Sequence, residues 1–181
     1  FSTLADAPAS YVAFGLLEGV DEFFNLTNSV GIDEALADCA PGCWTGAVTV
    51  NLLSVYEAGT DSHTARVSVG GAPVGEASWT GEKYVSFTGP FSSTNLTGNL
   101  AALKIENVLI APPDYSLTDT SRFLCMSCRF SYPRLYRARD NTLRCTGGSS
   151  NTVAVSGFAT NDIAVLDVTV ANAPVAVEPV A

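Results

Sequence analysis

The chain has 181 residues, of which 47% are hydrophobic and 15% are charged, and its formal net charge at pH 7 is -9. This charge excludes a general nucleic-acid binder, because such proteins owe their affinity to Lys and Arg contacts with phosphate groups. The high apolar content excludes an intrinsically disordered chain, and the length suits one domain with a sizeable core.

The N-terminal part of the chain has few signals for regular structure. Residues 1–14 contain Pro8 and small residues without any basic group, so we expect an extended segment. A helix is predicted around Ile32 to Cys39, where Asp33 and Glu34 would favour the positive N-terminal end of a helix dipole. Residues 100–105 are a second place where a helix could begin.

Strand patterns dominate the rest of the chain. The segment from Thr64 to Val69 alternates polar and apolar residues, and Gly70-Gly71 ends it. Short strands at a spacing of about 8–12 residues, separated by turn residues, are typical of an all-β sandwich or barrel. The predicted strands cover residues 48–56, 64–69, 74–79, 83–87, 103–110, 123–132, 152–158 and 163–170.

We therefore predict an all-β fold with a single β-sandwich, jelly-roll or immunoglobulin-like, over residues 15–171. Residues 1–14 would form an extended N-terminal segment and residues 172–181 an extended C-terminal tail. In the tail, Pro174 and Pro179 restrict pairing to the edge of a sheet. No apolar stretch reaches the about 18 residues that a membrane-spanning helix needs, so no membrane span is predicted.

Five cysteines form two close pairs and one single residue. In an oxidising compartment, four of them would form two disulfides and leave one thiol over. Alternatively, the two pairs would meet as a tetrahedral zinc site, or the thiols would stay free and buried. The candidates for a disulfide or a metal site are Cys39, Cys43, Cys125, Cys128 and Cys145.

Charged residues are segregated along the chain. Seven acidic residues and no basic residue precede the first cysteine, whereas six of the nine basic residues, all of them Arg, lie between residues 122 and 144. One hypothesis is that the acidic region of one subunit meets the Arg segment of the next, which builds rings or filaments. The alternative is that the two patches neutralise each other within one subunit or are solvated. The interface candidates are Arg122, Arg129, Arg134, Arg137, Arg139, Arg144, Asp21, Glu22, Asp33 and Glu34.

Two sequons mark Asn25 and Asn95 as candidates for glycosylation, if the compartment allows it. The chain begins at Phe1 and not at a methionine, which would fit the removal of a secretion signal. We therefore expect the protein to be extracellular, or to lie on the surface of a cell or particle.

The sequence lacks a recognisable catalytic motif. His63, the single histidine, is expected to be a solvated loop residue, because its neighbours Asp61 and Ser62 do not make a triad, which is defined by geometry. Trp44 and Trp79 are expected in the core or at sheet edges, not in a sugar-stacking platform. We expect neither an enzyme nor a bound cofactor.

These observations favour a structural subunit that assembles with copies of itself into an extracellular filament, a pilus-like fibre or a virion or particle shell. Terminal segments would add as strands to a neighbour's open sheet edge, and the charged patches would complement each other. The alternative is a secreted β-sandwich module that binds carbohydrate or protein, since a sandwich fold alone does not decide function.

Overall fold

The structure is a computed structural model that describes residues 8–11, 29–54, 62–108, 123–145, 153–170 and 172–178. The chain divides into two compact units. The larger unit is Pro8–Arg134, and the smaller unit is Leu135–Ala181 together with Phe1–Ala7. The described residues contain no α-helix, and none of their helical segments has the length and apolar composition needed to cross a membrane.

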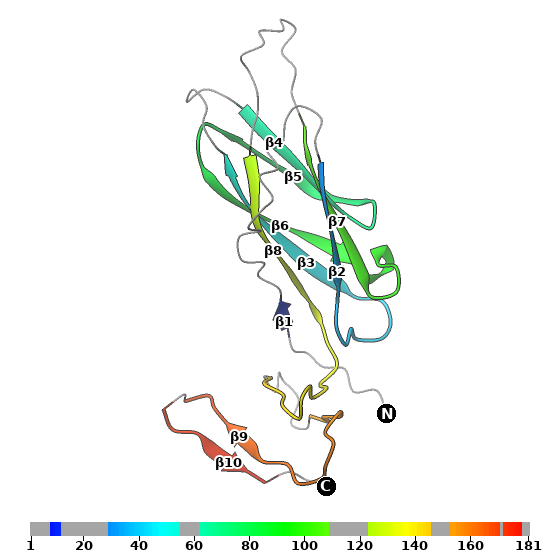
Figure 1. The fold of residues 1–181 in the computed structure, drawn as a ribbon, viewed down its shortest axis with the longest axis vertical. Coiled ribbons are helices and arrows are strands. Elements are labelled where there is room, and N and C mark those ends of the chain that lie inside the picture. Colours follow the sequence, from blue (N-terminus) through cyan, green and yellow to red (C-terminus); the bar gives the residue numbers. More distant parts are fainter. Residues whose placement is uncertain are drawn as a thin grey trace, which may run out of the picture. The chain divides into compact units, whose positions relative to one another are not determined.

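The larger unit consists of two antiparallel four-stranded sheets packed as a sandwich (Figure 1). The first sheet has the order β1–β8–β3–β6, with β1 (Pro8–Tyr11), β8 (Phe123–Pro133), β3 (Thr45–Ser54) and β6 (Tyr84–Ser92). The second sheet has the order β2–β7–β4–β5, with β2 (Ser29–Ala35), β7 (Leu100–Asn107), β4 (Ser62–Val69) and β5 (Ala72–Thr80). The predicted all-β sandwich is thereby confirmed.

The core lies between the two sheets because side chains alternate along each strand. In β3, Val48, Val50 and Leu52 are fully buried, and their neighbours face outward. Across the sandwich they meet side chains such as Val67 of β4 and Ile105 of β7, which are also fully buried. Burial of each such side chain contributes about 1.5–3 kcal/mol, so this layer is the main source of the unit's stability.

The outer faces of the two sheets carry different polar contacts. On the first sheet, the hydroxyl oxygens of Thr49 and Thr88 lie 2.9 Å apart in a hydrogen bond, and Asn51 Nδ2 donates to the Ser127 hydroxyl at 2.8 Å. The second sheet carries cross-strand and along-strand ion pairs instead. Its pairs are Arg66 with Glu76 at 2.7 Å and Lys104 with Glu106 at 2.6 Å.

Tight turns require glycine at the β4–β5 connection. Gly70 and Gly71 have φ values of 55° and 80°, in the left-handed region that disfavours other residues. A side chain at Gly70 would also collide with the backbone oxygen of Asn95. The predicted end of the strand at Gly70-Gly71 is therefore confirmed, and the turn joins two strands of the same sheet.

The two predicted helices are wrong. Residues 29–35 form strand β2, in which Ile32 lies opposite Leu103 of β7, and residues 100–107 form β7 itself. In both segments every second residue faces inward, and this period of two fits a sheet but not a helix. Pairing with a neighbouring strand thus overrides the weak helical signal of Asp33 and Glu34.

The smaller unit contains a two-stranded antiparallel ribbon, β9 (Val165–Asp167) and β10 (Val175–Val177). The predicted strand over residues 163–170 is thus much shorter, and residues 153–158 form only an isolated bridge at Ser156. The strands of the two sheets of the sandwich all lie between Pro8 and Pro133, and the sequence-based limits at residues 15 and 171 stay a prediction.

Candidate assembly interface

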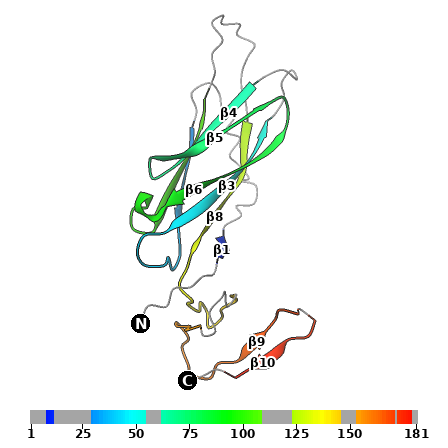
Figure 2. The ribbon, with the colours of Figure 1, turned by 180° about the vertical axis from the view of Figure 1, so that it is seen from behind.

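The edge of β8 is where an N-terminal segment of the chain contacts the sandwich (Figure 2). β1 pairs antiparallel with the end of β8, from Pro8 opposite Pro133 to Tyr11 opposite Phe130. Before Phe130, β8 pairs with β3 on one side, and no described strand pairs with its other side. β1 therefore covers only part of this edge.

A hydrogen bond of the Pro133 carbonyl shows which backbone groups of β8 face β1. Pro8 lies opposite Pro133, and neither has an N–H to donate. The carbonyl of Pro133 accepts the N–H of Ala40 at 2.9 Å, on the side away from β1. Because successive residues of a strand point their backbone N–H and C=O groups to opposite sides, those of Tyr132 point toward β1. Its partner Ala9 therefore directs its N–H at β8, and the following residue directs its N–H away.

The predicted Arg-rich segment is spread over both units. Arg134 Nη2 donates to Asp38 Oδ2 at 3.2 Å, and the side chains are 25% and 11% exposed. Arg134 therefore pairs with an acidic residue of its own chain. Arg129 is exposed on the outer face of the first sheet, opposite Thr49. The exposed arginines of the smaller unit are Arg137, Arg139 and Arg144, and Arg122 lies outside the described residues.

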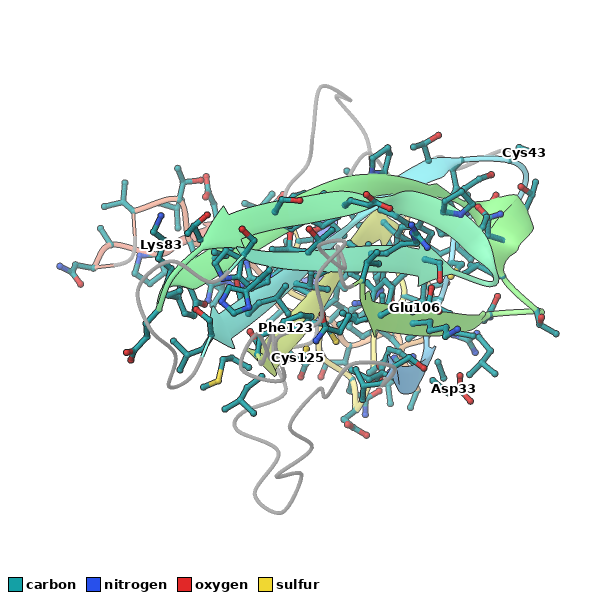
Figure 3. The ribbon with its side chains drawn as sticks, turned by 90° about the horizontal axis from the view of Figure 1, so that it is seen from above. Asp33, Cys43, Lys83, Glu106, Phe123 and Cys125 are labelled. Atoms are coloured by element: carbon teal, nitrogen blue, oxygen red, sulfur yellow. The ribbon has the colours of Figure 1, made fainter. Side chains whose placement is uncertain are left out.

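The acidic candidates that the structure describes are Asp33 and Glu34, both on β2. Asp33 is exposed and lies opposite Ala102 of β7 (Figure 3). Glu34 is half-buried on the inward side of its strand, and its charge adds to the burial that raises the pKa of Cys128. A carboxylate that points inward from an edge strand discourages pairing with a further strand. Asp21 and Glu22 lie outside the described residues.

All five cysteines are free thiols in the structure, so it contains neither the predicted pair of disulfides nor the alternative zinc site. The backbone of Cys39 forms an isolated β-bridge with Arg134, beyond the end of β8. Figure 3 shows Cys43 well apart from Cys125. No group of three or more metal-ligating side chains occurs among the described residues. Only Cys128 is buried, whereas Cys43 and Cys145 are exposed.

A β-bulge orients the C-x-x-C pair. Opposite β3, the register passes from Ser127 at Asn51 to Cys125 at Leu52, which leaves Met126 as the extra residue. Cys125 and Cys128 therefore share the inward face of β8, although a regular strand would point them to opposite faces. Burial is the main cause that raises the pKa of Cys125 to about 12 and that of Cys128 to about 11. Both thiols are protonated at neutral pH and are poor nucleophiles.

The prediction of a solvated loop histidine is wrong. His63 lies on β4 and is 1% exposed, because the alternation of this strand places it on the same inward face as Ala65 and Val67. Its ring stacks on Trp79 with the ring centroids 5.1 Å apart, and Trp79 meets Phe123 edge-on at 5.2 Å. Trp79 is thus a core residue, as predicted, and His63 belongs to the same aromatic cluster.

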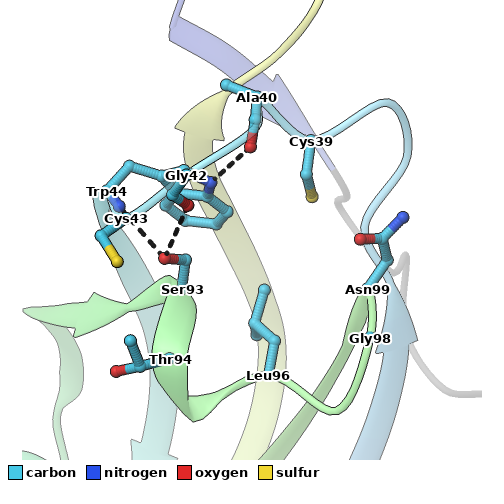
Figure 4. Close-up of a pocket in the computed structure, with 10 residues that line it drawn as sticks. All are labelled: Cys39, Ala40, Gly42, Cys43, Trp44, Ser93, Thr94, Leu96, Gly98 and Asn99. Carbon is cyan, nitrogen blue, oxygen red and sulfur yellow. Dashed lines mark hydrogen bonds between the residues drawn. The ribbon is translucent and has the colours of Figure 1, made fainter.

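A cavity of about 230 Å³ lies beside the loop that joins β2 to β3 (Figure 4). Trp44 forms one wall, where its ring stacks on Tyr132 at 5.9 Å. The Ser93 hydroxyl accepts the backbone N–H of Trp44 at 3.1 Å and donates to the carbonyl of Gly42 at 3.4 Å. Trp44 Nε1 also donates to the carbonyl of Ala40 at 2.9 Å. These contacts hold the loop in place, and Trp44 serves as a structural aromatic at the end of the sandwich.

One of the two sequons lies in the described residues. Asn95 ends the short 3₁₀ helix η1 (Ser93–Asn95), and its Oδ1 accepts the backbone N–H of Ser92 at 3.0 Å. Ser92 in turn accepts the N–H of Thr94, so the asparagine is part of a capping box. Asn25 lies outside the described residues. Glycosylation of either residue stays a prediction.

Sequence reasoning missed that β6 is the edge strand of the first sheet. The signal was Pro90, because central strands rarely contain proline. It also missed Asp38 as the partner of Arg134, because these residues are 96 positions apart and only the antiparallel path of β8 brings them together.

No protein-family model and no curated protein matches the sequence. Among solved structures, the chain is similar to dimeric latent PorU from Porphyromonas gingivalis, with a TM-score of 0.48 and 7% sequence identity. The match covers 83% of this chain and 14% of that chain, so the chain spans a small part of the length of the structure that it matches. A likeness at this level says nothing about activity.

Proposed function

We propose that this chain is a structural subunit that assembles with copies of itself by exchanging the strand β1. The observation that carries the proposal is the pairing of β1 with the edge of β8. The next strand in the sequence, β2, belongs to the other sheet. A short strand that adds to an open sheet edge is a common way for one polypeptide to bind another. We place such an assembly outside the cell or on a particle surface.

The connection to β1 is long enough for exchange. Between Tyr11 and Ser29 lie the 17 residues from 12 to 28, which span up to roughly 55–60 Å when extended. The same four backbone pairs form whether β1 comes from its own chain or from a neighbour. Each copy offers one strand and one edge, so passing β1 from each copy to the next is a heterologous contact, which builds rings or filaments.

Two features of the smaller unit support assembly. Its arginines Arg137, Arg139 and Arg144 are exposed, in keeping with complementary charged patches between copies. Its ribbon exposes large apolar side chains, with Leu166 at 56% and Val175 at 61%. Exposed apolar groups of this kind mark surfaces that are covered in an assembly.

The test compares two proline variants of the full chain, Ala9→Pro and Ser10→Pro. Ala9→Pro removes an N–H that faces β8, whereas Ser10→Pro removes one that faces away, so the matched variants differ only in pairing. Native mass spectrometry and light scattering measure the distribution of oligomers. We expect Ala9→Pro to shift the distribution toward smaller oligomers and Ser10→Pro to leave it unchanged. Equal behaviour of both variants, or a monomeric wild type, would overturn the proposal.

A second candidate function is a secreted binding module for carbohydrate. It is favoured by the outer face of the first sheet, where Thr49, Thr88, Asn51 and Ser127 form a row of hydroxyl and amide groups. Exposed Tyr84 lies on the same face, at 62% exposure. A monomeric wild type that binds a glycan array, and loses that binding with Tyr84→Ala, would favour this function over assembly.

A further inference from the structure

Three of the four edges of the two sandwich sheets carry features that oppose pairing with another strand. β2 has Asp33 and the inward-pointing Glu34. β5 has Pro73 and a register shift next to Gly75. β1 is four residues long and starts at a proline, and the part of β8 that β1 leaves unpaired carries the exposed Arg129. Such charges, prolines and bulges are how natural sheets keep their edges from associating.

β6 is the exception. It is nine residues long, it has no charged residue, and no described strand pairs with its outer side. Its inward side chains Val85 and Phe87 are only partly buried, whereas their partners on β3, Leu52 and Val50, are fully buried. Apolar side chains at this edge are therefore left half-covered. A long, uncharged and partly apolar edge is a site for strand addition.

The backbone of β6 offers a defined set of free groups. The backbone carbonyl of Lys83 accepts the N–H of Ser54, and the N–H of Ser93 donates to the carbonyl of Trp44. The backbone groups of residues 83 and 93 therefore point toward β3. The alternation then directs the N–H groups of the even-numbered residues Tyr84, Ser86 and Thr88 away from β3. Pro90 follows at the next outward position, which limits the free ladder to residues 84–88.

We propose that β6 pairs antiparallel with β6 of a second copy across a two-fold axis centred on Ser86. Tyr84 of one copy then lies opposite Thr88 of the other, and each pair exchanges two N–H···O bonds. On the inward side, Val85 lies next to Phe87 of the other copy and covers the half-exposed apolar groups. The second copy is the matching occupant, because an edge without charge pairs with itself without like-charge repulsion.

This contact deepens the proposed function and rests on it. A two-fold contact through β6 closes on itself as a dimer, whereas exchange of β1 is open-ended. Together they make the dimer the repeating unit of an assembly, with the first sheets of two copies continuous across the axis.

The test uses charge at the centre of the contact. Ser86→Lys and Ser86→Glu each place two like charges opposite each other, so in each variant alone the β6 contact should dissociate about tenfold more readily than in wild type. A mixture of the two variants should restore a mixed dimer, which native mass spectrometry resolves by mass. Ala102→Lys, an exposed position on the inner strand β7, is the matched control and should dimerise like wild type.

Hydrogen exchange gives a second measurement. The amides of residues 84, 86 and 88 should become more protected as the protein concentration rises, and the Ser86→Pro variant should lose this protection. The proposal is overturned if the lysine and glutamate variants associate like wild type, or if these amides exchange at a rate independent of concentration.

The two proposals fail separately. In the Ala9→Pro background, which removes strand exchange, the β6 contact predicts that dimers persist and that the added substitution Ser86→Lys dissolves them. Monomers in the Ala9→Pro background, from a wild type that forms polymers, would overturn the β6 contact and leave strand exchange intact.

Discussion

The strands of the two units differ in how far their apolar side chains are buried. In the larger unit, Val48, Val50 and Leu52 alternate along β3 and are fully buried beneath a second sheet. In the smaller unit, Leu166 and Val175 lie on a ribbon of two short strands and are mostly exposed. Two strands have no second layer to cover them, and such a ribbon is at best marginally stable in isolation. An alternating sequence thus yields a core only where the topology supplies a facing sheet.

The two units also differ in the side chains and strand edges that they expose. The sandwich holds most of its aromatic groups in an interior cluster and leaves one edge, β6, without protective charge. The smaller unit leaves the apolar side chains of its ribbon and its arginines on the surface. Stability therefore resides in the larger unit, whereas the proposed contacts between copies would involve both units. Four measurements test this difference between the two units.

The largest expected effect is the loss of a core aromatic. Phe130 is fully buried on β8, and its ring meets Phe91 edge-on at 5.7 Å. Phe130→Ala should lower the free energy of unfolding by about 3–5 kcal/mol, because it removes apolar contacts and leaves a cavity. Urea denaturation followed by tryptophan fluorescence measures the change. A loss below about 1 kcal/mol would mean that the sandwich core does not carry the stability.

A pH effect should also come from the larger unit. Burial raises the pKa of Cys125 to about 12 and that of Cys128 to about 11, from the ordinary value of 9.0. Above pH 9 the unfolded chain releases these protons while the folded chain keeps them, so the free energy of unfolding falls between pH 9 and about 11. Thermal unfolding of wild type and of the Cys125→Ala/Cys128→Ala variant across this range isolates the effect. Parallel pH profiles for the two proteins would contradict it.

A smaller effect is expected from the ion pair of Arg134 with Asp38. The pair is partly exposed and has one contact at 3.2 Å, so we expect a coupling energy of about 0.2–1 kcal/mol. A double-mutant cycle with Arg134→Ala and Asp38→Ala measures it. Loss of the coupling at high salt would be consistent with a screened pair, whereas a coupling of several kcal/mol would require a much drier environment than the structure shows.

The smallest effect on stability is expected in the ribbon. Leu166→Ser should change the free energy of unfolding of the larger unit by less than about 0.5 kcal/mol, because the side chain is 56% exposed. The same substitution should reduce association between copies, measured by light scattering. A loss of stability as large as that of Phe130→Ala would show that the ribbon belongs to the folding core and would break the comparison.

The sequence by itself determined the fold class and most strands of the sandwich. Alternation is a local property, and turn residues such as Gly70-Gly71 mark the ends of strands without any knowledge of their partners. Six of the predicted strands therefore correspond to strands β3 to β8. The Arg-rich segment was also visible from the sequence, because charge counts need no structure.

Only the tertiary structure decided the order of the strands, their edges and their partners. Residues 32–39 read locally as a helix, yet pairing with β7 makes a strand of their first part. His63 read as a loop residue, but the strand continues past it and turns it inward. The free edge of β6, the bulge beneath Cys125 and Cys128 and the ion pair of Asp38 all depend on contacts between residues far apart in the chain. Such contacts follow from strand order and register, which local propensity does not specify.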